Sequence, residues 1–173
     1  MAPQVRISDR MGNHSFATTM ADIFDRSVCD AHITRIHQLT ADTRPHWGKM
    51  NAAQMLAHLS KPYEMVCDPN YAATHKRPNA FARFFLKSFL KPIVVGPKPY
   101  ANNSRTAPSF VVADERVLEV ERRRLLGYID QVQAWGAKHF EGKDNHSFGV
   151  MSAQEWNNLF AKHLEHHLRQ FGV

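Results

Sequence analysis

The sequence has few cysteines and no long apolar run, and both absences limit what the protein can be. Its two cysteines, Cys29 and Cys67, lie far apart and outside any Cys-x-x-Cys spacing, so we predict neither a disulfide framework nor a thiolate zinc site. No stretch approaches the roughly eighteen consecutive apolar residues of a membrane-spanning helix, and the N-terminus lacks the apolar run of a secretory signal. We therefore expect a cytoplasmic protein with no stable membrane insertion.

Basic residues outnumber acidic ones, but they do not form the runs that accompany nucleic-acid binding. The formal net charge is +6, from 22 lysines and arginines against 16 aspartates and glutamates. These side chains are spread along the chain without a recognition motif, so nucleic acid is not an expected partner.

The length favours one domain. A chain of 173 residues, 43% of them hydrophobic, can bury one core but is short for two. Residues 1–20 have little periodicity and mixed polarity, so we expect a flexible N-terminal lead-in there and a single helical domain at 21–173.

Apolar spacing predicts four amphipathic helices and almost no strand. Asn51 with Gln54, and Ser152 with Glu155, have the spacing of a capping box at a helix start. The pattern predicts an all-α four-helix bundle. Its helices are expected at about residues 22–39, 51–66, 114–135 and 152–171.

Pro62 leaves two structures open for the second helix. If the helix continues through the proline, the carbonyl of His58 loses its helical donor and the helix should kink, which would widen the space beside His58. Alternatively the helix ends at Lys61, which would be structurally ordinary.

The connection at residues 68–110 is too long for a tight turn between the second and third helices. It contains NAFARFFLKSFLKPIVV, residues 79–95, which predicts a short amphipathic helix with phenylalanines and cations. Such a helix can bind a membrane surface, but we expect its aromatic side chains to cover the end of the bundle. The part that follows is rich in proline and asparagine and predicts irregular structure.

Three histidines fall on helix faces that should turn inward. At about 100° per residue, His163 and His167 lie about 40° apart on the last helix, so both imidazoles can bind one metal ion. His58 lies on the inward stripe of the second helix, between Met55 and Met65. Each histidine alone would be an ordinary buried polar group, but burying three without partners would cost several kcal/mol. Together they predict a facial three-histidine site with open coordination positions.

Five further residues are candidates for the surroundings of this site. Tyr63 follows the proline, and Glu121 and Arg122 flank the inward seam of the third helix, so each could orient a ligand or contact a substrate. Helix surface or a salt-bridged rim is the simpler explanation for these three. His166 and Gln170 lie close to the histidine pair on the last helix. We assign no catalytic residue.

Two segments, WGKMNAAQMLAHL around His58 and FGVMSAQEWNNLFAKHLEHHLRQFGV at the C-terminus, resemble the DinB/YfiT-like superfamily of metalloenzymes. The resemblance covers about residues 22–173. It implies a four-helix bundle of up-down-down-up topology, with a long crossover between helices two and three. It also implies a divalent metal held by one histidine of the second helix and an H-x-x-x-H pair of the last. These positions match His58, His163 and His167, with His166 and Gln170 beside them.

Characterised members of that superfamily include transferases and isomerases that use low-molecular-weight thiols. The resemblance therefore implies a metal-dependent S-transferase or hydrolase with a small-molecule substrate, a low-molecular-weight thiol among the candidates. The expected cofactor is a divalent transition metal, zinc or nickel in the first place and iron or manganese as alternatives.

Two other functions stay open. One is a non-catalytic metal-binding or ligand-sensing bundle involved in stress response. The other is a protein that binds a membrane surface or a partner through residues 79–95. A homodimer is compatible with each, because an amphipathic bundle can bury an exposed seam against its copy.

Overall fold

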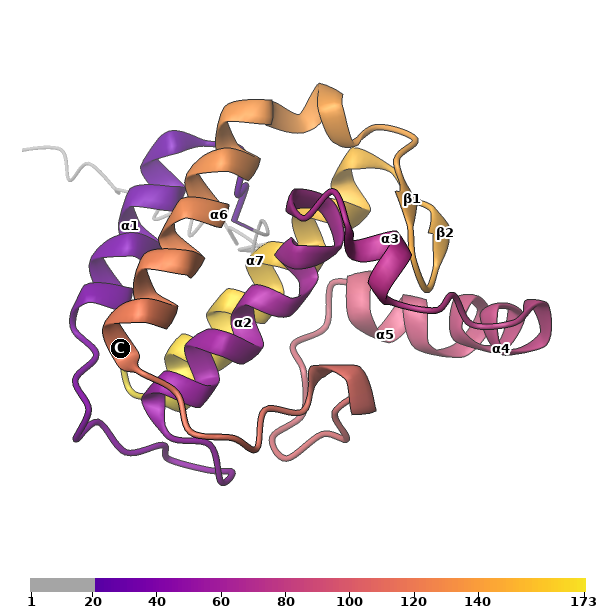
Figure 1. Ribbon diagram of the computed structural model, residues 1–173. Helices are drawn as coiled ribbons and strands as arrows, with labels where there is room; N and C mark the ends of the chain where they lie inside the picture. The colour runs from indigo at the N-terminus through magenta and orange to yellow at the C-terminus, as the bar shows by residue number, and fades with distance from the viewer. Residues whose placement is uncertain (1–20) are drawn as a thin grey trace, which may run out of the picture.

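The computed structural model describes residues 21–173, and these are mostly helical (Figure 1). The lead-in expected at 1–20 lies outside the described residues. The predicted all-α class is confirmed, apart from one small hairpin that was not predicted. Within residues 21–173, no helix combines the length and the apolar character needed to cross a membrane. The long helices are α1 (Arg26–His37), α2 (Ala52–Cys67), α6 (Leu118–Phe140) and α7 (Ala153–Gln170).

The remaining elements are short and lie in the two connections that follow α2 and α6. Between α2 and α6 are α3 (Tyr71–Thr74), α4 (Ala80–Phe85), the π-helical turn η1 (Leu86–Leu90), α5 (Lys91–Val95) and the 3-10 turn η2 (Pro108–Phe110). Between α6 and α7 is an antiparallel hairpin of β1 (Asp144–Asn145) and β2 (Gly149–Val150), which pairs Asp144 with Val150 and Asn145 with Gly149.

Both predicted capping boxes are present. The Asn51 side chain accepts from the Gln54 N–H at 2.9 Å, and the Gln54 side chain accepts from the Asn51 N–H at 3.1 Å. The reciprocal bonds between Ser152 and Glu155 measure 3.2 and 3.0 Å. These bonds satisfy N–H groups that a helix start leaves unpaired, so α2 and α7 begin where the sequence predicts.

The other two long helices differ from their predicted bounds. Asp25 caps α1 by accepting from the Ser27 N–H at 2.8 Å, so this helix begins at Arg26. The chain before α6 stays extended at Val117, and the helix then runs to Phe140 across a break at Gly136, where φ is +68°. Glycine tolerates this conformation because it has no Cβ. Apolar spacing reports the buried face of a helix, not its caps, which explains the errors at these ends.

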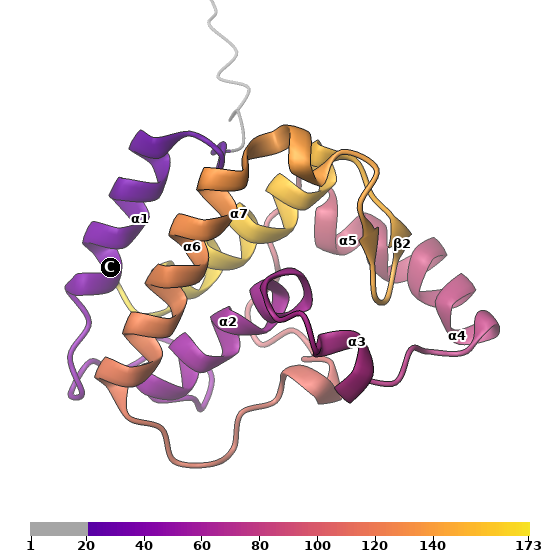
Figure 2. The ribbon, with the colours of Figure 1, turned by 45° about the horizontal axis from the view of Figure 1, so that its top comes forward.

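The four long helices pack around one apolar core (Figures 1 and 2). The contact between α2 and α6 is the most extensive, and α7 contacts both of them. Trp156 and Phe160 from α7 are fully buried beside Phe140 at the end of α6. The core therefore holds α7 against α2, which places the inward faces of these two helices next to each other.

Helix α2 continues through Pro62, so the alternative in which it ends at Lys61 is wrong. Because proline has no N–H, the carbonyl of His58 has no helical donor at residue 62. The helix then runs five residues further to Cys67 and its C-cap at Asp68.

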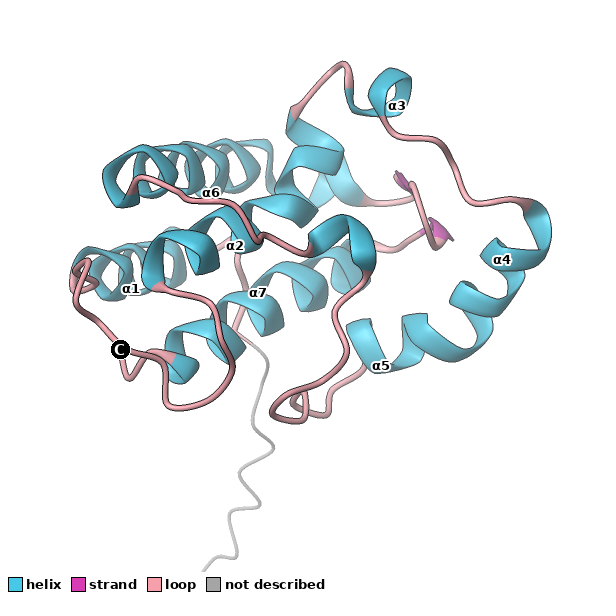
Figure 3. Ribbon diagram, turned by 60° about the horizontal axis from the view of Figure 1, so that its bottom comes forward, coloured by secondary structure: helices cyan, strands magenta, loops and turns pink. Residues whose placement is uncertain are grey.

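The crossover forms the predicted aromatic helix, but its phenylalanines do not cover the bundle. The elements α4, η1 and α5 follow one another without a gap. Helix α5 packs on α7, and α4 lies away from the four long helices (Figure 3). Phe81, Phe84, Phe85 and Phe89 are between 54% and 82% exposed, so the prediction that they close the end of the bundle is wrong. The segment packs against the core through Leu86, Val94 and Val95 instead.

We predict that Asn51→Ala lowers the free energy of unfolding by about 1 kcal/mol, because α2 then loses the side-chain acceptor of its capping box. Urea unfolding followed by circular dichroism measures this change. Asn102, exposed in the crossover, provides the matched control, and Asn102→Ala should change the value by less than about 0.5 kcal/mol. Equal losses in the two variants would contradict the role assigned to the cap.

Candidate metal centre

The three predicted histidines meet between α2 and α7. His58 comes from the middle of α2, and His163 and His167 come from the second half of α7. One nitrogen from each ring lies within 4.8 Å of the other two, and the ring centroids are 4.6 to 4.8 Å apart. The side chains are 4%, 8% and 8% exposed, respectively. The structure thus brings together the residues that the two inward helix faces indicated.

A backbone carbonyl of the crossover determines the tautomer of His58. The Nδ1 atom of His58 lies 2.8 Å from the carbonyl oxygen of Phe110, in η2. A carbonyl can only accept, so Nδ1 carries the proton and Nε2 keeps its lone pair. The lone pair is therefore on the nitrogen that faces His163.

A side-chain amide does the same for His167. The Gln170 Nε2 donates to the Trp47 carbonyl at 2.6 Å, so the amide oxygen of Gln170 is the atom 2.7 Å from His167 Nδ1. That nitrogen must donate, which leaves the lone pair on Nε2. Gly48 makes room for the amide, because its φ is +84° and a Cβ there would lie 2.6 Å from Gln170 Nε2.

His163 is the member of the triad whose hydrogen bonds are incomplete. Its Nε2 lies 2.8 Å from His58 Nε2, so in the absence of an ion it must donate to that lone pair. Its Nδ1 is then a buried acceptor with no partner among the described residues. A buried polar atom without a partner costs about 1–3 kcal/mol. Hydrogen bonding within the protein therefore leaves the triad unsatisfied.

The donor set fits a transition-metal ion. Two nitrogens that bind one zinc ion at about 2.0–2.1 Å and at the tetrahedral angle are roughly 3.3 Å apart. The 2.8 Å between His58 Nε2 and His163 Nε2 is about half an ångström shorter, so a small movement of the rings would admit the ion. Two of the three rings already present Nε2 lone pairs whose other nitrogens are hydrogen-bonded, the arrangement that orients metal-binding histidines. Three imidazoles and no carboxylate form the group.

Burial keeps the three imidazoles neutral, the form that binds metal. Loss of water is the main cause in each ring: it lowers the pKa of His58, lowers that of His163 well below its ordinary value of 6.5, and lowers that of His167 to about 3. Mutual repulsion between charged imidazoles adds to the effect on His163 and His167.

Half-buried aromatic rings border the triad. The His166 ring centroid lies 4.9 Å from that of His167, 5.8 Å from Trp47 and 5.5 Å from Tyr100. Burial also lowers the pKa of His166. His166 is thus a neighbour of the triad and no member of it, and Trp47 and Tyr100 are surrounding residues that sequence reasoning missed.

Lys162 connects the crossover to α7 directly beside His163. Its buried ammonium donates to the carbonyls of Ile93 at 2.8 Å and Gly96 at 2.7 Å, and it lies 4.4 Å from the ring centroid of Tyr100. Burial lowers its pKa to about 8. A lysine on a predicted helix looks like surface, so the sequence carried no signal for this contact.

Tyr63 belongs to the core. Its ring is fully buried and stacks on Phe160 with centroids 4.5 Å apart. Burial raises the pKa of its hydroxyl well above the ordinary value, and that hydroxyl has no hydrogen-bond partner among the described residues. These contacts favour core packing over the predicted place beside the triad.

Glu121 and Arg122 make ion pairs and a link to α1. Glu121 is buried beside two arginines, and Arg122 reaches the start of the connection after α1. The contacts are those of Arg116 and Arg124 with Glu121, and those of Arg122 with Glu119 and the Leu39 carbonyl. None of these contacts involves the triad, so the salt-bridged rim is the better description of both residues.

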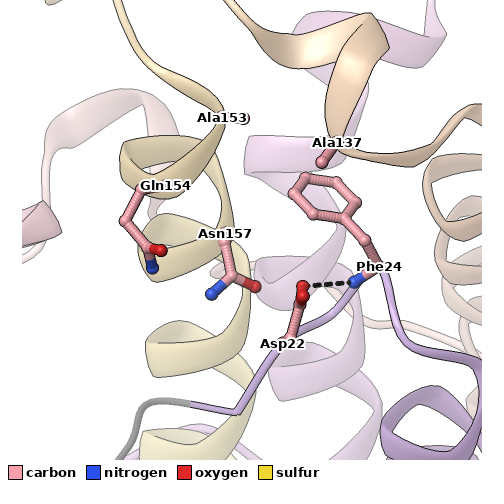
Figure 4. A pocket seen from close by; sticks show the side chains of 6 residues that line it. All are labelled: Asp22, Phe24, Ala137, Ala153, Gln154 and Asn157. Atoms are coloured by element: carbon pink, nitrogen blue, oxygen red, sulfur yellow. Dashed lines mark hydrogen bonds between the residues drawn. The ribbon is translucent and has the colours of Figure 1, made fainter.

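A small cavity of about 100 Å³ lies elsewhere, between the chain before α1 and the start of α7 (Figure 4). The Asp22 carboxylate accepts a hydrogen bond from the Phe24 N–H at 3.0 Å, and the Asn157 side chain accepts one from the Ile23 N–H at 2.7 Å. The lining consists of Asp22, Phe24, Ala137, Ala153, Gln154 and Asn157, none of which has a metal-binding imidazole. It is therefore separate from the candidate metal centre.

A family model described as a protein of unknown function, DUF1569, matches residues 22–172. The chain belongs to the DUF1569 family. The part matching DUF1569 includes His58, His163 and His167 and extends through α7. No curated protein and no solved structure gives a significant match. The resemblance to the DinB/YfiT-like superfamily stays a prediction, and the candidate metal centre of this DUF1569 chain rests on the geometry of its own residues.

We predict that the metal-free protein loses stability as the pH falls below about 6.5. The folded pKa of each triad histidine lies below its unfolded value, so the unfolded chain takes up protons first. Stability is complete above the unfolded value of 6.5 and falls from there towards the folded pKa, about 3 for His167. The limiting slope is about 1.4 kcal/mol per pH unit for each histidine. Urea unfolding at several pH values between about 5.5 and 7.5 measures it.

Two variants separate the triad from other titrating groups. His167→Asn should lower the slope of the free energy of unfolding against pH by the contribution of one histidine. His37→Asn, on the exposed face of α1, should leave this slope unchanged. A parent protein whose stability is flat over this range would contradict the burial of neutral imidazoles.

Proposed function

We propose that this protein is a metal-dependent enzyme whose divalent transition-metal ion is bound by His58, His163 and His167. The observation that carries the proposal is the convergence of three buried, neutral imidazoles, two of which have Nε2 lone pairs determined by partners on Nδ1. Zinc and nickel suit imidazole ligands best, and iron or manganese remain alternatives that elemental analysis distinguishes.

The arrangement of the helices supports the topology in this proposal, the DinB-like up-down-down-up bundle. In that topology the second and third helices run parallel and need a crossover. The Gln54 side chain at the start of α2 donates to the Asp114 carbonyl shortly before α6 at 3.2 Å. The two helices therefore start at the same end and pack together, and residues 68–117 return the chain between them.

The reaction we propose is a thiol-dependent S-transfer or a hydrolysis on a small-molecule substrate, with a low-molecular-weight thiol as the first candidate. A divalent metal bound here would lower the pKa of a coordinated thiol or water towards neutrality. The chain supplies orientation: the Phe110 carbonyl and the Gln170 amide keep protons on the Nδ1 atoms. His166, half-buried beside His167, is the imidazole best placed to exchange a proton with solvent.

A second candidate is a non-catalytic metal-binding bundle, which senses a ligand or is stabilised by its ion. The burial of the triad favours it, because imidazoles that are 8% exposed or less leave little surface for a substrate. The two candidates share their ligands and differ in turnover. A panel of thiols and electrophiles tested with the reconstituted protein distinguishes them.

We predict that the untagged protein purifies with about one equivalent of a transition metal, and that His58→Ala and His163→Ala each lose it. Plasma mass spectrometry on the three proteins gives the stoichiometry. The exposed His37 on α1 provides the matched control, since His37→Ala should keep the full equivalent. A parent protein that takes up no zinc, nickel, iron or manganese after reconstitution would rule out the metalloenzyme and leave three core imidazoles.

We also predict that Gln170→Ala weakens metal binding by about 10- to 100-fold, because His167 loses the acceptor that orients its ring. Competition with a chromophoric chelator measures the affinity. Gln131→Ala, on the exposed face of α6, should leave the affinity at the parent value. An unchanged affinity in Gln170→Ala would show that the amide does not support the ligand.

A further inference from the structure

Residues 80–95 present an apolar stripe that has no partner within the part of the chain that the structure describes. Four of its side chains follow one another at intervals of four residues, and residues four apart lie on the same side of a helix. The rings of Phe85 and Phe89 are 4.8 Å apart, so the stripe is continuous. It consists of Phe81 (82% exposed), Phe85 (54%), Phe89 (60%) and Ile93 (63%), with Phe84 (66%) beside it.

The same segment has a charge of one sign. From Lys76 to Lys98 the sequence contains six lysines and arginines and no aspartate or glutamate, so this stretch carries as much formal charge as the net +6 of the whole chain. Arg77 and Lys91 pair with Asp144 and Glu155. The exposed cations are Lys76, Lys87 and Lys98, together with the partly paired Arg77.

Three cations of the segment lie on the helix face opposite the apolar stripe. Arg83, Lys87 and Lys91 also repeat every four residues, but each lies two positions from a stripe residue, which is about 160° away on a helix. Arg83 and Lys91 pair with Asp144 and Glu155, whereas Lys87 is exposed. A lysine side chain is long enough to reach from the polar face of a helix towards a headgroup layer. This is the order of groups on a helix that lies in a membrane interface.

The base of the segment is held on α7. The Asn158 side chain donates to the Val95 carbonyl at 2.7 Å, and Lys162 donates to the carbonyls of Ile93 and Gly96. At its other end α4 extends away from the long helices (Figure 3). The exposed stripe can therefore reach a flat surface without any opening of the core.

We infer that residues 76–98 dock the protein on an anionic phospholipid surface, with the phenylalanines in the interface and the lysines among the headgroups. A second copy of the chain would bring a second set of the exposed Lys76, Lys87 and Lys98 against the first, and these like charges repel. A nucleic acid would need the cations at the centre of the exposed surface, where phosphates bind, and here that centre is apolar. The inference does not depend on the metal centre.

The test is co-sedimentation of the full chain with vesicles. One set contains phosphatidylcholine alone, and the other contains equal parts of phosphatidylcholine and phosphatidylglycerol. We expect binding to the anionic vesicles at about 50 mM salt and its loss at about 500 mM, where charge is screened within a few ångströms. Phe85→Ser should lower the partition coefficient about tenfold, and Lys87→Gln about fivefold.

Matched variants lie outside the segment. Val117→Ser removes an apolar side chain that is 65% exposed before α6, and Lys138→Gln removes an exposed cation near the end of α6. Neither should change the partition coefficient. Lys87 does not contribute to the core, so its variant tests docking without a risk to folding.

Three results would overturn the inference. The first is a parent protein that does not bind anionic vesicles at low salt. The second is binding that Phe85→Ser and Lys87→Gln leave intact, which would assign it to another surface. The third is a parent protein that does not bind vesicles but forms a concentration-dependent dimer in analytical ultracentrifugation. If Phe85→Ser abolished that dimer, the stripe would be an interface between copies of the chain.

Discussion

The contact between His58 and His163 is the interaction on which the candidate centre depends. Two Nε2 atoms 2.8 Å apart must share a proton or a cation, and the lone pair of His58 is already determined by the Phe110 carbonyl. These two atoms lie together because apolar contacts in the core pack α7 against α2. It is completed from outside these helices, since Trp47 holds Gln170 and through it His167. The site is therefore a property of the folded chain and not of one helix.

Burial has two opposite consequences for function. Removal of water keeps the imidazoles neutral, and this prepares them for a metal ion without competition from protons at neutral pH. In the proposed enzyme the same burial would restrict the approach of a substrate. The half-buried rings of Trp47, Tyr100 and His166 lie at the edge of the triad and not in the core.

The crossover between α2 and α6 contributes more than a connection. Its turn at η2 provides the carbonyl that orients His58, and Lys162 holds its middle on α7. Before both contacts, at residues 81–89, it carries the exposed phenylalanines, and residues 76–98 contain six cations and no acidic residue. A segment that is fixed at one end and apolar on its outer face would provide the lipid-docking surface that we infer, in addition to the proposed centre.

Local patterns in the sequence determined the helices that matter most for the site. The capping boxes at Asn51 and Ser152 defined the starts of α2 and α7, since these bonds join residues three apart, and helical spacing put His58, His163 and His167 on inward faces. The late start of α6 at Leu118 and the break at Gly136 were not predicted, because the apolar spacing that marks a helix does not indicate where the helix begins, breaks or ends.

Only the tertiary structure decided which groups complete the site and which side chains stay outside. The Phe110 and Trp47 carbonyls are backbone atoms, identical in every residue, so no sequence pattern could select them. Tyr63 is buried in the core, and Phe85 is exposed to solvent although the sequence pattern predicted that it would cover the end of the bundle. An apolar residue is buried only where another element offers it a surface, and that depends on contacts between residues far apart in the chain.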